Sequence, residues 1–133
     1  MGIGSMTLNE MAKEIHAVAA AHGWHEKERT FGEIIALCHS ELSEALEEYR
    51  NDKCMIYRQC PTSCQHIETC IIDINNGVGS CPVKPAGIAI ELADCIIRIL
   101  EYCADVGVDI ERAIALKHEY NKTRPHRHGG KLI

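Results

Sequence analysis

Residues 91–100 read ELADCIIRIL, and the wider stretch 88–106 carries apolar side chains on nearly every side of a helical wheel. A helix that is apolar almost all round lies buried, either within a bundle or at a subunit interface. Its narrow polar wedge contains Glu91, Asp94, Arg98, Glu101 and Asp105. A buried acid must be paired or must bind a cation, because an uncompensated buried charge is very costly. This stretch therefore predicts both a helical core and a site for a cation.

Three further helices accompany this one, and each has recognisable start and stop signals. Thr7 and Thr30 each open a helix with a capping box, and Asp109 is the expected N-cap of the last helix. The four expected helices span residues 7–22, 31–51, 87–106 and 110–123. A chain of 133 residues suits one domain, so we expect a single all-α domain of the four-helix-bundle type.

Residues 52–86 interrupt the helical pattern with three of the four prolines and five of the eight cysteines. We interpret this segment as an irregular insert between the second and third helices. Within it, residues 70–74 and 78–83 flank a turn signal and are expected to pair as a short hairpin. Residues 1–5 are interpreted as a leader or a cloning scar, and residues 125–133 as a flexible basic tail.

The cysteines fall into two groups. Cys38, Cys95 and Cys103 sit in apolar helical patterns, so we expect them to be small core residues. The insert holds Cys54, Cys60, Cys64, Cys70 and Cys81. A structural Zn²⁺ site is one interpretation of this second group, but its spacing matches no common zinc motif, and reduced thiols in a loop fit better. Free thiols without an export signal indicate a reducing, cytoplasmic environment.

The charge balance and the hydropathy argue against two classes of partner. The 19 Asp and Glu residues outnumber the 14 Lys and Arg residues, which argues against binding nucleic acid through its phosphates. The first residues have neither the basic nor the apolar region of a signal peptide. No stretch is long and apolar enough to span a bilayer, so we expect no membrane partner.

Two acid pairs lie at i and i+3 in the second and third expected helices: Glu41 with Glu44, and Glu91 with Asp94. This spacing puts both carboxylates of a pair on one helical face. Two such helices packed together gather four carboxylates, an oxygen-only set that suits Mg²⁺, with Mn²⁺ as a substitute. Glu48 and Arg98 are candidates to support these acids. The alternative is a solvated acidic face, which we prefer for Glu47 and Glu101. A di-iron carboxylate site is disfavoured, because such sites use Glu-x-x-His pairs and neither acid pair has a histidine at that spacing.

The last expected helix carries a stripe of hydrogen-bond donors. Lys117, Asn121 and Arg124 fall at i, i+4 and i+7, and Tyr120 lies beside them. Donors of this kind suit a polyphosphate whose charge a metal has partly neutralised. The alternative is an ordinary surface with bases placed favourably in the last turn of a helix. The pairing with the acidic constellation favours the first interpretation. For Arg127, His128 and Lys131 we prefer a loose basic tail, with a flap over the phosphates as the alternative.

Taken together, E-x-x-E, a spacer, E-x-x-D and K-x-x-x-N-x-x-R-P-x-R-H-G-G-K resemble the MazG-like branch of the all-α NTP pyrophosphatases. That superfamily also contains dCTP pyrophosphatases, dimeric dUTPases and phosphoribosyl-ATP pyrophosphatase. The resemblance extends from about residue 6 to residue 131, except for the cysteine-rich insert. This insert lengthens the segment between the two acid motifs beyond what is usual in the family.

The resemblance implies hydrolysis of a nucleoside triphosphate to a monophosphate and pyrophosphate, with the four acids as catalytic Mg²⁺ ligands. It implies that Lys117, Asn121 and Arg124 lie near the phosphates, and that the chain forms a homodimer or homotetramer. Trp24, the only tryptophan, is the best candidate to stack on a base, and a core or interface role is its alternative. A non-catalytic nucleotide sensor or partner-binding helical module is the competing function. The preferred base stays open.

Overall fold

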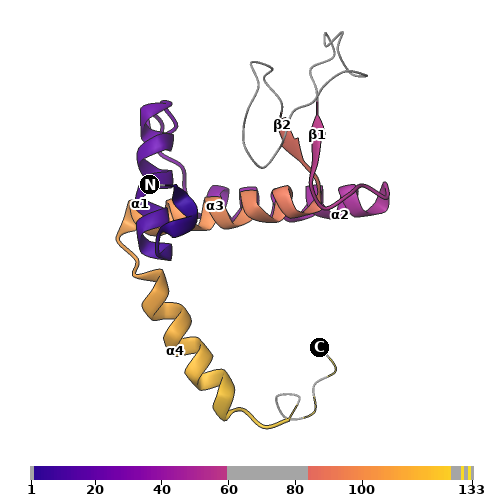
Figure 1. Ribbon diagram of the computed structural model, residues 1–133. Helices are drawn as coiled ribbons and strands as arrows, with labels where there is room; N and C mark the ends of the chain where they lie inside the picture. The colour runs from indigo at the N-terminus through magenta and orange to yellow at the C-terminus, as the bar shows by residue number, and fades with distance from the viewer. Residues whose placement is uncertain (1, 60–83, 127–129, 131, 133) are drawn as a thin grey trace, which may run out of the picture. The chain divides into compact units, whose positions relative to one another are not determined.

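The computed structural model describes residues 2–59, 84–126, 130 and 132. This part of the chain is mostly helical, as the sequence predicts (Figure 1). Its elements are a short 3-10 helix at Ile3–Ser5, α1 at Leu8–Ala21, α2 at Phe31–Arg50, β1 at Tyr57–Gln59, β2 at Lys84–Ala86, α3 at Ile88–Val106 and α4 at Ile110–Thr123. The four predicted helices are confirmed, each with its ends within one residue of the expected position.

The chain divides into two compact units. The central unit is Thr30–Ile96 and contains α2, the small sheet and the first half of α3. The terminal unit consists of Met1–Arg29 and Ile97–Ile133, and it contains α1, the second half of α3, and α4. Of the helices described, none is long and apolar enough to cross a membrane.

The predicted helix starts are confirmed by their side chains. The Thr7 hydroxyl accepts a hydrogen bond from the Glu10 backbone, and the Glu10 carboxylate accepts one from the Thr7 backbone at 2.8 Å. Thr30 and Glu33 repeat this reciprocal pattern at the start of α2. These bonds satisfy backbone donors that the first turn of a helix leaves without partners. Local sequence chemistry therefore places both helix starts.

In the central unit, the two ends of the insert pair with each other. β1 and β2 are antiparallel, with Tyr57 opposite Ala86. The Met55 carbonyl accepts a hydrogen bond from the Ala89 backbone at 2.9 Å, so the chain before β1 lies against the start of α3. The predicted hairpin at residues 70–83 lies outside the described residues.

Gly87 makes this close approach possible. Its φ is +118°, and a Cβ built there would lie 2.5 Å from the Met55 carbonyl oxygen. A side chain at this position is therefore excluded both by the backbone conformation and by the neighbouring carbonyl. The glycine fixes where α3 begins relative to the insert.

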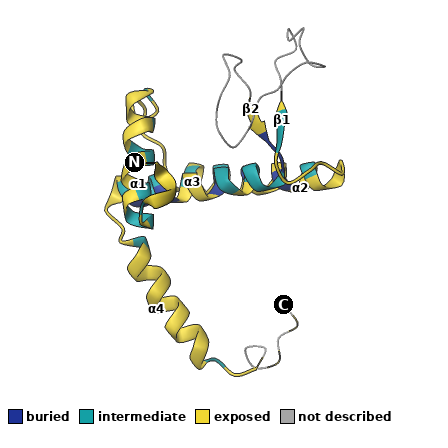
Figure 2. Ribbon diagram, in the orientation of Figure 1, coloured by how far each residue is buried: buried dark blue, intermediate teal, exposed yellow. Residues whose placement is uncertain are grey.

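In the terminal unit, Asn9 joins the start of α1 to the start of α4. Its side-chain amide donates to Asp109 Oδ1 at 2.9 Å, and its side-chain oxygen accepts from the Ile110 backbone at 3.1 Å. The bond from Asn9, followed by the bond from the Arg112 backbone, holds the pKa of Asp109 below its usual value. The predicted N-cap at Asp109 is confirmed. Beyond this junction, α4 is exposed along almost its whole length (Figure 2).

Among the described residues, most of the buried apolar side chains are small. They are Ala12, Cys38, Ala45, Ala86, Cys95, Leu100 and Cys103. The expected burial of three cysteines is confirmed, and burial raises the pKa of the Cys103 thiol. Of the two predicted ways to bury α3, complete burial within the single chain is not found, because Leu92 and Ile96 remain 44% and 54% exposed. Burial at a subunit interface stays a prediction.

Candidate metal centre

Three of the four predicted ligands meet between α2 and α3. Glu41, Glu91 and Asp94 each bring one carboxylate oxygen into a group whose members lie within 4.8 Å of one another. Glu41 is only 7% exposed, and Glu91 and Asp94 are half-buried. All three residues belong to the central unit. The expected meeting of the two acid pairs is therefore found for these three side chains.

Glu44 joins the group through Glu91, with which it shares a hydrogen bond. The pKa of Glu91 is raised from 4.5 to about 6, first by burial, then by this hydrogen bond, and then by the charges of Glu44, Asp94 and Glu41. A hydrogen bond between two carboxyl groups requires a proton on one of them. The four acids thus form one cluster, the acid cluster, which concentrates negative charge.

The insert reaches the acid cluster through Tyr57 on β1. The Tyr57 hydroxyl donates a 2.9 Å hydrogen bond to Glu48 Oε2. This bond is the main reason that the pKa of Tyr57 is raised, and desolvation and the charges of Glu48 and Glu91 act in the same direction. Glu48, a predicted supporting residue, is therefore held by Tyr57. Sequence reasoning missed Tyr57, because only the pairing of β1 with β2 brings it to the acids.

The donors fit a hard dication. The acid cluster offers only carboxylate oxygens, which Mg²⁺ prefers over softer ligands. After burial, the negative charges of Glu44, Asp94 and Glu41 also raise the pKa of Glu91, so a dication bound there would relieve the repulsion among the acids. Glu41, Glu91 and Asp94 are close enough to share one ion, and Glu44 lies beside them through its hydrogen bond to Glu91.

The predicted phosphate-binding residues lie in the terminal unit. On α4, Lys117 Nζ lies 4.9 Å from the centre of the Tyr120 ring, and Arg124 Cζ lies 5.8 Å from it. Asn121 is exposed on the same helix. Two members of the predicted stripe, Lys117 and the half-buried Arg124, therefore lie near the Tyr120 ring. Arg98, the other predicted supporting residue, is half-buried in the second half of α3.

Trp24 also belongs to the terminal unit, where its side chain is 55% exposed. The Arg29 guanidinium lies 5.3 Å from the centre of its ring. A core role for Trp24 within the single chain is therefore wrong, whereas a base-stacking role and an interface role both require exposure.

Several predictions fall outside the described residues. The zinc site in the insert, which we favour less than reduced thiols, would involve Cys60, Cys64, Cys70 and Cys81. The flap, which we favour less than a loose tail, would involve Arg127, His128 and Lys131. Of the insert cysteines, only Cys54 is described, and its thiol is exposed and not in a disulfide.

Comparisons with protein-family models, with curated proteins and with solved structures found no match to this chain. The functional inference accordingly rests on the chemistry of the acid cluster and on the sequence motifs.

Proposed function

We propose that this protein is a Mg²⁺-dependent enzyme that hydrolyses a nucleoside triphosphate to a nucleoside monophosphate and pyrophosphate. The observation that carries the proposal is the gathering of Glu41, Glu44, Glu91 and Asp94 between α2 and α3. Support comes also from the resemblance of the acid motifs and of the α4 stripe to MazG-like pyrophosphatases. Mn²⁺ is the expected substitute for Mg²⁺, because it accepts the same oxygen donors.

In this proposal Glu41, Glu91 and Asp94 hold the ion. The bound ion would supply Lewis-acid polarisation of the triphosphate and of the attacking water. Water attacks the α-phosphorus, the bond from this phosphorus to the bridging oxygen of the β-phosphate breaks, and a proton leaves the water. Glu44 and Glu48 are the two candidates to accept that proton: Glu44 shares a hydrogen bond with Glu91, and Glu48 accepts one from the Tyr57 hydroxyl.

The α4 stripe would bind the phosphates in the same proposal. Lys117 and Arg124 would stabilise the charge that develops on the departing pyrophosphate, and Asn121 would donate a hydrogen bond. Trp24 and Tyr120 offer exposed aromatic faces on which a base can stack. Lys117 and Arg124 would thus contribute to both substrate affinity and the rate of hydrolysis, whereas the aromatic faces would contribute to affinity.

The assembly that we propose is a homodimer or homotetramer. It is supported by a stripe of large apolar side chains that the single chain leaves exposed along α2, made of Phe31, Ile35, Leu42, Leu46 and Tyr49. A contiguous exposed apolar surface of this kind is typical of an interface. Light scattering on the Leu42→Glu/Leu46→Glu variant should give a lower mass than on the unaltered chain. Monomeric unaltered protein would contradict the assembly.

A nucleotide screen tests the activity. The purified chain is incubated with standard and modified nucleoside triphosphates and Mg²⁺, and both products are identified. We expect monophosphate and pyrophosphate, with loss of turnover in Glu41→Gln. Glu47→Gln is the matched control, because the Glu47 carboxylate only accepts a hydrogen bond from Asn51 on the exposed surface. Tight nucleotide binding without any product would instead favour the non-catalytic sensor, and orthophosphate release would change the reaction class.

A further inference from the structure

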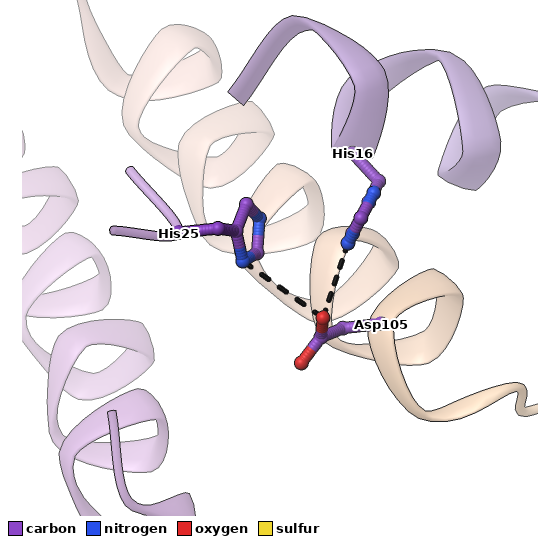
Figure 3. Close-up of side chains that lie close together, drawn as sticks. All are labelled: His16, His25 and Asp105. Atoms are coloured by element: carbon purple, nitrogen blue, oxygen red, sulfur yellow. Dashed lines mark hydrogen bonds and ion pairs between the residues drawn. The ribbon is translucent and has the colours of Figure 1, made fainter. Parts of the chain in front are cut away.

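A second cluster of metal-ligating side chains lies in the terminal unit. His16 comes from α1, His25 from the segment after α1, and Asp105 from the last turn of α3. One ring nitrogen of each histidine and one carboxylate oxygen of Asp105 all lie within 4.8 Å of one another. Figure 3 shows the two imidazoles converging on the Asp105 carboxylate from different segments. Sequence reasoning placed Asp105 in the polar wedge of the helix but assigned no role to His16 or His25.

The distances suit donors around one small ion. His16 Nε2 lies 3.1 Å from Asp105 Oδ1, and His25 Nδ1 lies 3.8 Å from the same oxygen. Two donors bound to one tetrahedral Zn²⁺ at about 2.0–2.1 Å lie roughly 3.3 Å apart. The two imidazole rings have their centres 4.4 Å apart and are tilted by 35°. An ion entering between the donors requires only small side-chain movements.

The second nitrogen of His25 is also engaged. Its Nε2 lies 3.0 Å from Glu101 Oε1, one helical turn before Asp105 on α3. A histidine that binds a metal through one nitrogen commonly donates its other N–H to a carboxylate, which fixes the tautomer and the ring orientation. Glu101 fills that role for His25. A simple ion pair between one histidine and one acid does not require this arrangement.

We propose that His16 Nε2, His25 Nδ1 and Asp105 bind a divalent first-row transition ion of the Zn²⁺ class, with Glu101 orienting His25. Mixed imidazole and carboxylate donors suit such ions better than Mg²⁺. All four side chains are partly open to solvent, between 21% and 47% exposed, so an ion can enter. The bound ion ties α1, the segment after it and the end of α3 together. Three ligands leave a fourth position for water.

Cobalt provides the test, because its visible absorption reports coordination number and ligand type. The whole chain, with its thiols reduced, is titrated with Co²⁺ in the presence of excess Mg²⁺. The Mg²⁺ is added to occupy the acid cluster, so that Co²⁺ reports on the histidine site. We expect the intense bands of four-coordinate Co²⁺ without thiolate charge transfer, and their loss in His16→Gln and His25→Gln. The His39→Gln variant, with an exposed histidine on α2, is the matched control and should keep the bands. Glu101→Gln should weaken Co²⁺ binding by about 10- to 100-fold.

Bands that survive in both histidine variants would overturn the assignment, as would strong thiolate charge transfer, which would place the ion on cysteines. Far-ultraviolet circular dichroism checks that each variant is folded. A second measurement needs no variant: Zn²⁺ added to the unaltered chain should shift the imidazole ¹⁵N resonances of two of the eight histidines. Unchanged histidine resonances with bound Zn²⁺ would also overturn the assignment.

Discussion

The two halves of α3 carry similar acid pairs but present them to different partners. In the first half, Glu91 and Asp94 face further carboxylates on α2, and the pKa of Glu91 rises to about 6. In the second half, Glu101 and Asp105 face two imidazoles. One helix therefore supplies acids to an oxygen-only cluster and to a mixed nitrogen and oxygen cluster. The elements packed against it decide which ion each cluster suits.

The largest expected effect comes from the same substitution made in each half of α3. Asp94→Asn should lower Mg²⁺-dependent triphosphate hydrolysis by more than about 100-fold, because it removes a donor of the oxygen-only cluster. Asp94→Asn should leave the absorption bands of four-coordinate Co²⁺ intact. Asp105→Asn should abolish these bands and leave triphosphate hydrolysis intact. Steady-state kinetics and cobalt titration of both variants show whether each substitution removes one property alone. Loss of both hydrolysis and the Co²⁺ bands in either variant would contradict two separate ion sites.

A second prediction concerns the glycine that sets the start of α3. Gly87→Ala should lower the free energy of unfolding by about 2 kcal/mol or more, because an alanine is strained at positive φ and its Cβ meets the Met55 carbonyl. Urea denaturation measures the change. Gly32→Ala, in the first turn of α2, is the matched control: its Cβ has only an ordinary contact with Thr30, and helix propensity should make it neutral or slightly stabilising.

Equal stability in the two alanine variants would contradict the close packing of the insert against α3. The acid cluster sharpens this test. Since Glu91 lies one turn after Gly87, Gly87→Ala should also weaken Mg²⁺ binding in the folded fraction. The Co²⁺ bands from the ion at His16, His25 and Asp105 should persist.

The third prediction is a pH dependence of the acid cluster. The pKa of Glu91 is raised from 4.5 to about 6, so the folded chain binds a proton there more tightly than the unfolded chain. Without metal, this contribution to stability is complete below pH 4.5 and is lost as the pH rises through 6. Mg²⁺ binds the ionised carboxylate, so its affinity should fall by up to about tenfold per pH unit below 6.

Calorimetric titration with Mg²⁺ between pH 5 and 8, roughly spanning this ionisation, measures the dependence. Glu91→Gln should flatten it, while Glu47→Gln should leave it unchanged. A steep dependence that persists in Glu91→Gln would assign the proton to another group.

The smallest expected effect belongs to Tyr57, which acts on the acids through Glu48. Tyr57→Phe removes the hydroxyl but keeps the ring, over which the Lys53 ammonium lies at 5.8 Å. Mg²⁺ affinity should fall by about tenfold or less, and the pH profile of hydrolysis should shift as Glu48 loses its donor. The cobalt titration should not change. An unaltered pH profile would mean that Tyr57 stabilises β1 but does not act on the acids.

The local parts of the fold were readable from the sequence. Capping boxes at Thr7 and Thr30 and the N-cap at Asp109 act within one helical turn, so they placed helix starts without knowledge of the rest of the chain. The i, i+3 spacing of Glu91 and Asp94 similarly put two acids on one face. The sequence did not decide whether α3 is buried within the chain or at a subunit interface, because periodicity reports which face is apolar but not how much of it the single chain covers.

The sequence by itself determined the helices, the two acid pairs and the donor stripe of α4, because each depends on spacing along one helix. Only the tertiary structure decided that Tyr57 meets Glu48 and that His16, His25 and Asp105 converge. These contacts join segments far apart in the chain, and side-chain spacing within any one segment carries no information about them. Packing, rather than local pattern, brings such residues within the few ångströms that an ion requires.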